Sequence, residues 1–187
     1  MTKRLVLFSS VLIAMVLVGC AASVKQSNVN EARPVTQAVH TPAGTSRGGI
    51  AVVLSGPDTI MKSSDWPSLT NDWRELLPDS ASETKVNATF ITSESGLSEN
   101  QTMLVRIKVN DFRYISTAKR FMLGVMAGNA YMDLDIEYVQ LPSRQVVSSK
   151  KINTSSSAWE GIFSAVTPKQ VNAVSRVVLQ DAKRLNN

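Results

Sequence analysis

Three carboxylates alternate along the stretch YMDLDIEYVQ at residues 131–140. Asp133, Asp135 and Glu137 are each two positions apart, so on a β-strand they form a row on one face. Carboxylate oxygens bind hard cations such as Ca²⁺, and paired carboxylates can transfer protons. Neighbours in such a row are about 6.5–7 Å apart, which is too far for the coupling of a catalytic dyad.

Basic residues with the same spacing offer a structural explanation for the acidic row. Arg106 and Lys108 alternate in the earlier stretch TMLVRIKVND. If the two stretches are sheet neighbours, opposite charges face each other and each pair contributes about 0.2–1 kcal/mol. We therefore favour a cross-strand charge ladder over a metal site, and we expect no metal.

Other catalytic groups are scarce. The one histidine, His40, lies in a polar segment where a base would be poorly positioned. The one cysteine, Cys20, cannot form an internal disulfide, and with a single histidine it cannot build a zinc site of the Cys/His type. The sequence has no G-x-S-x-G motif and no phosphate-binding glycine loop.

Serines close to lysines leave one enzymatic alternative open. Ser148 and Ser149, and the serines at 155–157, lie near Lys150 and Lys151, as a Ser–Lys mechanism needs. Serine-rich strand ends are common, so we expect no enzyme and no cofactor.

The amino terminus has the layout of a secretory signal. Lys3 and Arg4 precede an apolar run from Leu5 to Val18. This run of about 14 residues is shorter than the roughly 20 that span a bilayer. Without the two signal cations, 18 basic residues face 15 acidic ones. That excess is small and no basic cluster is interleaved with aromatic residues, so we expect no nucleic-acid partner.

The residues LVGC at 17–20 resemble the lipobox of bacterial lipoproteins. The resemblance implies cleavage between Gly19 and Cys20, followed by lipidation of Cys20, which anchors the chain to a membrane. Two or more acyl chains anchor stably, because each buried methylene adds about 0.8 kcal/mol. In this family, Asp after the cysteine favours the inner membrane; Ala21 implies the outer membrane, with the periplasmic side preferred.

The domain organisation follows from these features. We expect a signal peptide at 1–19, the lipidated Cys20 with a flexible linker at 20–49, and one globular domain at 50–187. The segment from Ser23 to Gly49 is rich in Ser, Asn, Thr, Pro and Gly and has no sustained apolar period. A hydrophobic content of 43% suits a single modest core.

The domain begins with a buried strand and a helix. The run IAVVL at 50–54 is apolar on both faces. A helix capped by Ser64 or Asp65 is expected to end at Pro78. Its apolar positions have helical spacing, which favours core packing over ligand stacking by the tryptophans; they are Trp66, Leu69, Trp73 and Leu76.

Alternating residues predict four further elements of a sheet. The segments 85–92 and 102–111 are expected to be neighbouring antiparallel strands. The segment 131–140 and the segment 145–153 are expected to form a hairpin through the turn at 141–144.

Two amphipathic segments complete the domain. The segment SSAWEGIFSAV, with Trp159 and Phe163, is expected to cover a sheet face. A last helix is expected to start at a cap formed by Thr167, Pro168 and Gln170 and to end near Leu185. The fold class is therefore α/β, an α+β sandwich whose mixed, mostly antiparallel sheet of about five strands is packed by two to three helices.

The segment FMLGVMAGNA at 121–130 is almost wholly apolar. The favoured interpretation is a buried crossover in which glycine permits close backbone approach. The alternative is an exposed loop that meets a partner protein or enters a bilayer. The residues of this possible interface are Phe121, Met122, Leu123, Gly124, Met126 and Gly128.

The block NDFRYISTAKRFMLGVMAGNAYMDLDIEYVQLPSRQVVSSKK resembles the lipoprotein-associated domain-of-unknown-function family 4410. It departs from that pattern at the turn, where Ser143-Arg144 stands in place of an expected glycine. The resemblance implies a small periplasmic domain that assists envelope assembly, without catalytic residues. We expect a non-catalytic binding or accessory module with an envelope protein partner; the alternative is a periplasmic hydrolase or a small-ligand-binding lipoprotein.

Overall fold

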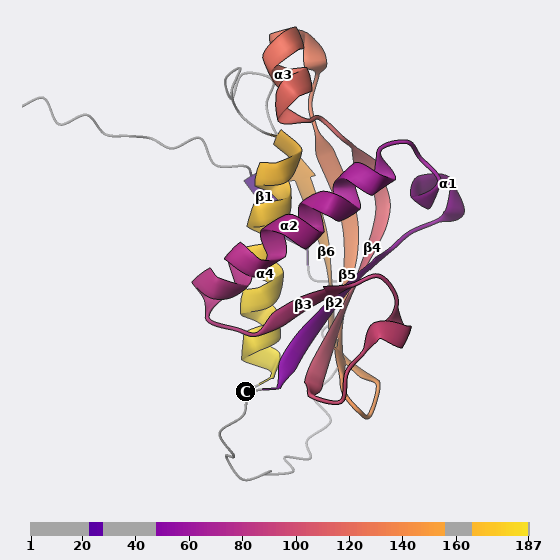
Figure 1. The fold of residues 1–187 in the computed structure, drawn as a ribbon, viewed down its shortest axis with the longest axis vertical. Helices are drawn as coiled ribbons and strands as arrows, with labels where there is room; N and C mark the ends of the chain where they lie inside the picture. Colours follow the sequence, from indigo (N-terminus) through magenta and orange to yellow (C-terminus); the bar gives the residue numbers. More distant parts are fainter. Residues whose placement is uncertain (1–22, 28–47, 156–165, 187) are drawn as a thin grey trace, which may run out of the picture.

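A computed structural model describes residues 23–27, 48–155 and 166–186 (Figure 1). They form one mixed sheet in the order β1-β6-β5-β4-β2-β3. The strands are β1 (Ser23–Ser27), β2 (Gly49–Ser55), β3 (Ala88–Ile91), β4 (Gln101–Arg113), β5 (Tyr131–Gln140) and β6 (Gln145–Ser155). The helices are α1 (Asp58–Met61), α2 (Trp66–Thr84), α3 (Thr117–Leu123) and α4 (Val166–Leu185), with the 3₁₀ turns η1 (Glu94–Gly96) and η2 (Gly124–Ala127). The expected fold class is confirmed.

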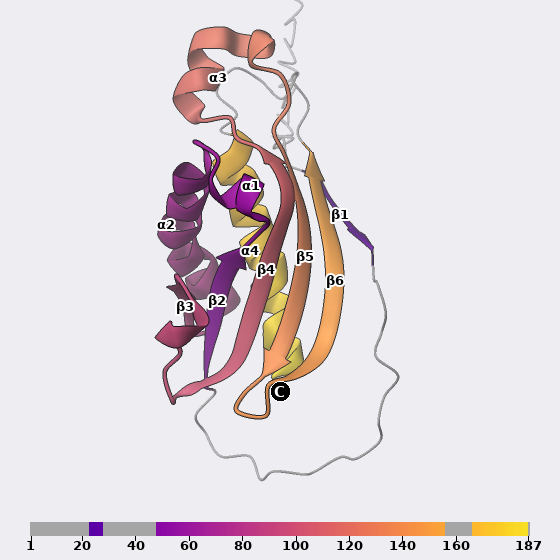
Figure 2. The same ribbon diagram turned by 90° about the vertical axis from the view of Figure 1, so that its right-hand side faces the viewer.

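Helices α2 and α4 cover one face of the sheet (Figure 2). On α2, Leu69 and Trp73 are fully buried, which confirms core packing for Trp73. On α4, Val171, Val174 and Val178 have helical spacing and are buried against the same face. The rows of β4 and β5 that point toward these helices are buried as their alternation predicts; they are Met103, Val105, Ile107, Val109, Met132, Leu134, Ile136 and Tyr138.

Strand β2 is buried on both faces, as its continuous apolar run predicts. It pairs in parallel with β3 on one edge and with β4 on the other. The expected antiparallel pairing between 85–92 and 102–111 is therefore wrong, because β2 lies between them. Alternation shows that a segment is a strand, but not which edge it joins.

The expected end of the first helix at Pro78 is also wrong, since α2 continues to Thr84. Proline removes one backbone hydrogen bond and usually kinks or ends a helix. Here Pro78 is exposed, whereas Leu77 and Ala81 on the neighbouring turns are buried. Packing of these side chains keeps the helix intact beyond the proline.

The expected linker at 20–49 needs a correction at its amino-terminal end. Residues Ser23–Ser27 form β1, which pairs antiparallel with β6. The sequence SVKQS shows no apolar period, so side-chain pattern could not reveal this strand. An edge strand is held by the unpaired N–H and C=O groups of its neighbour, which any sequence can bond.

The β5–β6 hairpin is confirmed, with strands meeting in antiparallel register around residues 141–144. In the turn, Arg144 has φ 58°, a left-handed conformation that favours glycine. This is where the family pattern led us to expect glycine. The amphipathic segment around Trp159 lies outside the described residues.

Candidate interaction site at helix α3

Helix α3 and turn η2 project beyond the end of the sheet, at the top of Figures 1 and 2. The projection leaves β4 after Arg113 and returns to β5 at Tyr131. Ser116 caps α3, because its hydroxyl accepts a hydrogen bond from the backbone N–H of Lys119 at 3.1 Å. Gly124 ends the helix with φ 52°, a conformation that a side chain would strain.

The projection exposes large apolar side chains. Met122 and Met126 are 80% and 85% exposed, and Phe121 and Leu123 are 61% and 48% exposed. The favoured interpretation of 121–130 as a buried crossover is therefore wrong for these four side chains, although Ala127 and Ala130 are buried. The alternative of an exposed apolar segment describes them, but they lie on helix α3 and turn η2 and not in a loop. Apolar composition predicts burial, but this segment extends past the sheet end, where α2 and α4 do not cover it.

The base of the projection is packed and hydrogen-bonded to α4, whereas its tip is exposed. Ile115, Ala127 and Ala130 form a small buried cluster. The hydroxyl of Thr167 accepts a hydrogen bond from the N–H of Ile115 at 2.9 Å, and the Gln170 side chain donates one to the carbonyl of Ala130 at 3.1 Å. Both ends of the projection are thus tied to α4.

These contacts change the interpretation of the start of α4. Thr167 and Gln170 were expected to form a capping box, yet α4 begins at Val166 and both polar side chains bond the base of the projection. Their sequence spacing fits a cap equally well, so only the tertiary structure identifies the true partners.

The projection is basic. Residues 112–130 contain three basic residues and no acidic one. Arg113 donates to the carbonyl of Ala127 at 3.3 Å, and the buried Arg120 donates to the carbonyl of Gly124 at 3.2 Å. Lys119 is exposed beside the apolar residues. The surface therefore combines exposed apolar side chains with positive charge.

The acidic row of β5 lies on the sheet face opposite to the helices, and part of the expected charge ladder is confirmed. Arg106 contacts Glu137 at 3.5 Å, across the β4–β5 register. Lys151 on β6 contacts Asp133 at 3.3 Å. Asp135 lies opposite Lys108 but accepts a 2.7 Å hydrogen bond from Asn110. In the part of the chain that the structure describes, no group of three His, Cys, Asp or Glu residues could hold a metal ion.

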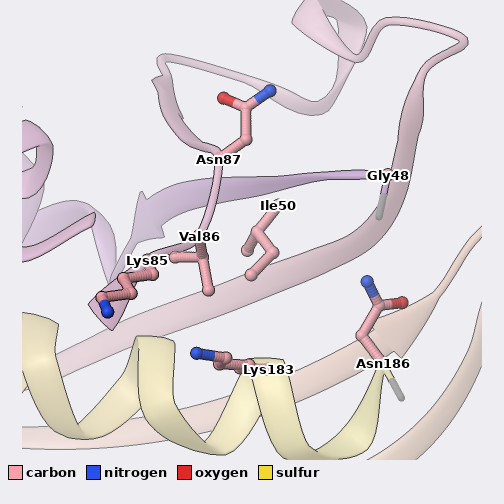
Figure 3. A pocket seen from close by; sticks show the side chains of 7 residues that line it. All are labelled: Gly48, Ile50, Lys85, Val86, Asn87, Lys183 and Asn186. Atoms are coloured by element: carbon pink, nitrogen blue, oxygen red, sulfur yellow. The ribbon is translucent and has the colours of Figure 1, made fainter. Parts of the chain in front are cut away.

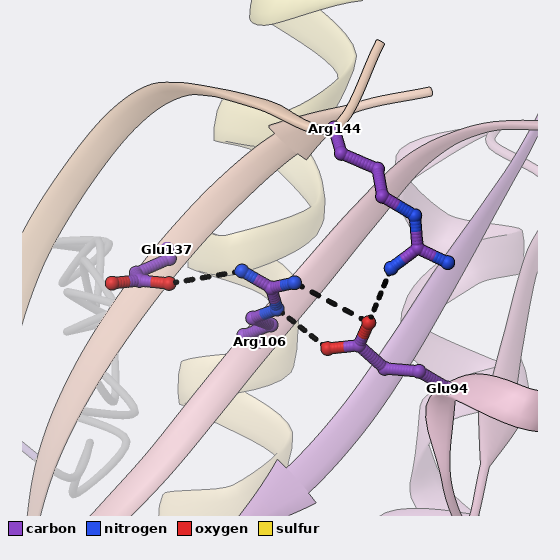
Figure 4. Close-up of polar contacts among 4 residues, drawn as sticks. All are labelled: Glu94, Arg106, Glu137 and Arg144. Carbon is purple, nitrogen blue, oxygen red and sulfur yellow. Dashed lines mark hydrogen bonds and ion pairs between the residues drawn. The ribbon is translucent and has the colours of Figure 1, made fainter. Parts of the chain in front are cut away.

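Glu94 joins this network from η1 and was missed in the sequence (Figure 4). Its carboxylate accepts hydrogen bonds from Arg106 at 2.7 Å and from Arg144 at 3.0 Å. These bonds, chiefly that from Arg106, lower the pKa of Glu94 below its usual value. Only its charge, opposite to that of Arg106, could have signalled the contact.

Both lysines of the Ser–Lys alternative form ion pairs, Lys151 with Asp133 as described above and Lys150 with an acid of α4. Lys150 is buried and forms an ion pair with Asp181 of α4. Asp181 also accepts hydrogen bonds from Tyr138 at 3.3 Å and from Arg184 at 2.8 Å. Burial, followed by the charge and hydrogen bond of Asp181, raises the pKa of Tyr138. A cavity of about 90 Å³ adjoins the cluster and is also lined by Ser148 and Ser149.

A second small cavity also lies near the carboxyl end of α4, between that helix and the start of β2 (Figure 3). It has about 60 Å³ and is lined by Gly48, Ile50, Lys85, Val86, Asn87, Lys183 and Asn186. Lys183 donates to the carbonyl of Thr84 at 2.8 Å, and Asn186 donates to the Thr102 hydroxyl at 2.9 Å. Ligand pockets usually have about 300–1,000 Å³, so this cavity suits a few water molecules.

Within residues 23–27, 48–155 and 166–186, no helix has the length and apolar character needed to cross a membrane. No family model and no curated protein matches the chain, so the resemblance to family 4410 stays a prediction.

Several solved structures are similar to the chain. A PelC dodecamer from Paraburkholderia phytofirmans has 15% identity and a TM-score of 0.49, with 86% of this chain and 98% of that chain covered. A family DUF330 protein from Xanthomonas campestris has 11% identity and a TM-score of 0.48, with coverages of 75% and 89%. A neuraminyllactose-binding hemagglutinin homologue from Helicobacter pylori has 10% identity and a TM-score of 0.37, with coverages of 85% and 92%. Similarities of this strength carry no argument about function.

Proposed function

We propose that the protein is a non-catalytic interaction module of the bacterial envelope, anchored through a lipid on Cys20 to the periplasmic side of the outer membrane. The α3 tip, defined as Phe121, Met122, Leu123 and Met126, is its interaction surface. The exposure of these four large apolar side chains above a buried base is the observation that carries the proposal. The motif LVGC supports the lipid anchor.

The polar clusters support a non-catalytic role because each one joins secondary-structure elements. Glu94 links η1 to β4 and to the β5–β6 turn through Arg106 and Arg144. Asp181 links α4 to β5 and β6 through Tyr138 and Lys150. These contacts hold secondary-structure elements together, and this role does not require a substrate.

The lipid anchor is tested by labelling cells with radioactive palmitate. We expect the full-length protein to incorporate label and to fractionate with the outer membrane. The Cys20→Ala variant should lose both the label and the membrane fraction. A variant that keeps its label would contradict lipidation at Cys20.

The interaction surface is tested with the double variant Met122→Asp, Met126→Asp. Both side chains are at least 80% exposed, so the free energy of unfolding should change by less than about 0.5 kcal/mol. In crosslinking of intact cells, the double variant should lose the adducts, protein or lipid, that the native protein forms. The matched control is Val146→Asp, an exposed apolar residue near the opposite end of the sheet. Adducts that survive in the double variant, or vanish equally in the control, would exclude the tip.

A further inference from the structure

The lipid attachment site and the α3 tip are brought to the same end of the molecule by the sheet register. Ser23, the first residue of β1, lies opposite Ser155 of β6. Ser155 lies opposite Tyr131 of β5, and Tyr131 lies opposite Arg113 of β4. Arg113 and Tyr131 are the two points where the projection leaves and rejoins the sheet. All four strand ends are therefore at the base of the projection.

The chain between the anchor and this end is short. Cys20 precedes Ser23 by three residues, which span at most about 10 Å when fully extended. If Cys20 carries the lipid, as the proposed function holds, this end of the sheet cannot move far from the bilayer surface. The β5–β6 turn at Ser143 is at the opposite end of strands that are ten and eleven residues long.

The chemistry of the projection fits a bilayer. Phenylalanine, leucine and methionine side chains are favoured in the boundary between headgroups and acyl chains. Helix α3 has only seven residues, so several of its terminal N–H and C=O groups lack an intrahelical partner, and the polar headgroup side of that boundary suits it better than the hydrocarbon core. The exposed Arg113 and Lys119, with no acidic residue at 112–130, match the negative charge of anionic headgroups.

We propose, on the basis of the proposed function, that the α3 tip inserts into the same membrane that holds the lipid on Cys20. The protein then has two contacts with one bilayer at one end of its sheet. These contacts fix its orientation, with the β5–β6 turn pointing away from the membrane. A partner protein bound at the tip is the competing possibility, and the sheet register disfavours it because the bilayer already faces this end.

The experiment uses the full-length lipidated protein in vesicles of phosphatidylethanolamine and phosphatidylglycerol. Met122 is replaced by Cys and labelled with an environment-sensitive fluorophore, and Ser143→Cys is the control at the opposite end. We expect the Met122→Cys probe to shift to shorter wavelength and to lose most of its fluorescence to quenchers on the lipid acyl chains. The Ser143→Cys probe should show neither change. Met126→Cys provides a second tip position in case the first variant folds poorly.

The outcomes separate the two proposals. Since lipidation consumes the thiol of Cys20, the protein without an added cysteine should not take up the fluorophore. If it does, the lipid anchor fails and the insertion proposal fails with it. If it does not, but both tip probes remain in water, the anchor stands and insertion is overturned; a protein crosslinked at Met122 would then identify the competing occupant. Equal quenching at Ser143 would overturn the orientation.

Discussion

At the scale of single residues, Arg144 shows how a local conformation and a long-range contact compete. Its φ of 58° is one that a side chain other than glycine adopts at a cost of about 1 kcal/mol. Its guanidinium contacts Glu94 at 3.0 Å, but the side chain is 59% exposed, so this contact is weak. Conformational cost and contact are therefore of similar size.

Two substitutions separate these effects. Arg144→Ala removes the contact and keeps the unfavourable conformation, whereas Arg144→Gly removes both. We expect the glycine variant to have a free energy of unfolding about 1 kcal/mol higher than that of the alanine variant. Urea denaturation of both variants measures the difference, and an alanine variant at least as stable as the glycine variant would refute the argument.

Glu94 predicts a pH dependence. Because its pKa is lowered in the folded protein, its contribution to stability is present above the ordinary value of 4.5 and is lost as the pH falls through the lowered pKa. We expect Glu94→Gln to cost no more than about 1 kcal/mol at neutral pH, since the network is partly exposed, and this cost should shrink as the pH falls below 4.5. Denaturation across this pH range checks it. Glu99→Gln, an exposed acid on the same connection, should lack this pattern.

At the scale of elements, the attachment of α4 to the sheet depends on a buried ion pair as well as on apolar packing. Lys150 and Asp181 are both less than one-tenth exposed. Breaking a buried pair by removing one partner leaves an uncompensated charge, whereas replacing both partners with apolar residues is often neutral. A single substitution should therefore destabilise the protein more than the double substitution that replaces both partners.

We expect Asp181→Asn to lower the free energy of unfolding by about 3 kcal/mol or more. The double variant Lys150→Met, Asp181→Leu should recover much of that loss. The comparison pair is Arg176–Glu83, which joins α4 to α2 at 2.7 Å but is about half exposed; there Glu83→Gln should cost less than about 1 kcal/mol. Similar losses at the two sites would show that burial of the first pair does not matter.

Strand β1 can be tested by a disulfide. Lys25 and Asn153 are directly opposed in the antiparallel register, and opposed Cα atoms in such pairs are about 4.5–5.5 Å apart, within disulfide reach. In a Cys20→Ala background, Lys25→Cys with Asn153→Cys should form a bond under mild oxidation. Lys25→Cys with Gln145→Cys, about 26 Å further along β6, should not. Equal yields from both pairs would contradict the strand.

The elements also show how much could be predicted from the sequence. Strands β2, β4, β5 and β6 and the buried faces of α2 and α4 follow from side-chain periodicity, because packing selects those residues. The pairing of β3 and the existence of β1 depend on backbone bonds at sheet edges, which leave no side-chain pattern. The extension of α2 past Pro78 depends on packing that follows the proline.

At the scale of the whole molecule, the candidate site was only partly predictable. The apolar composition of 121–130 singled out the right residues, yet it also suggested burial. Whether an apolar segment is covered depends on where it lies relative to α2 and α4, and that is a property of the complete fold (Figures 1 and 2). Thr167 and Gln170, which hold the base of the projection, gave only the signal of a helix cap.

The pairing of β1 with β6 joins the first described strand to the last. In a chain that crosses a membrane amino terminus first, β1 emerges long before β6 has left the translocation channel. During this delay β1 has no strand to pair with. The edge of β6 becomes available to it only after most of the polypeptide has crossed. In a chain exported in this order, closure of this edge would be a late step in folding.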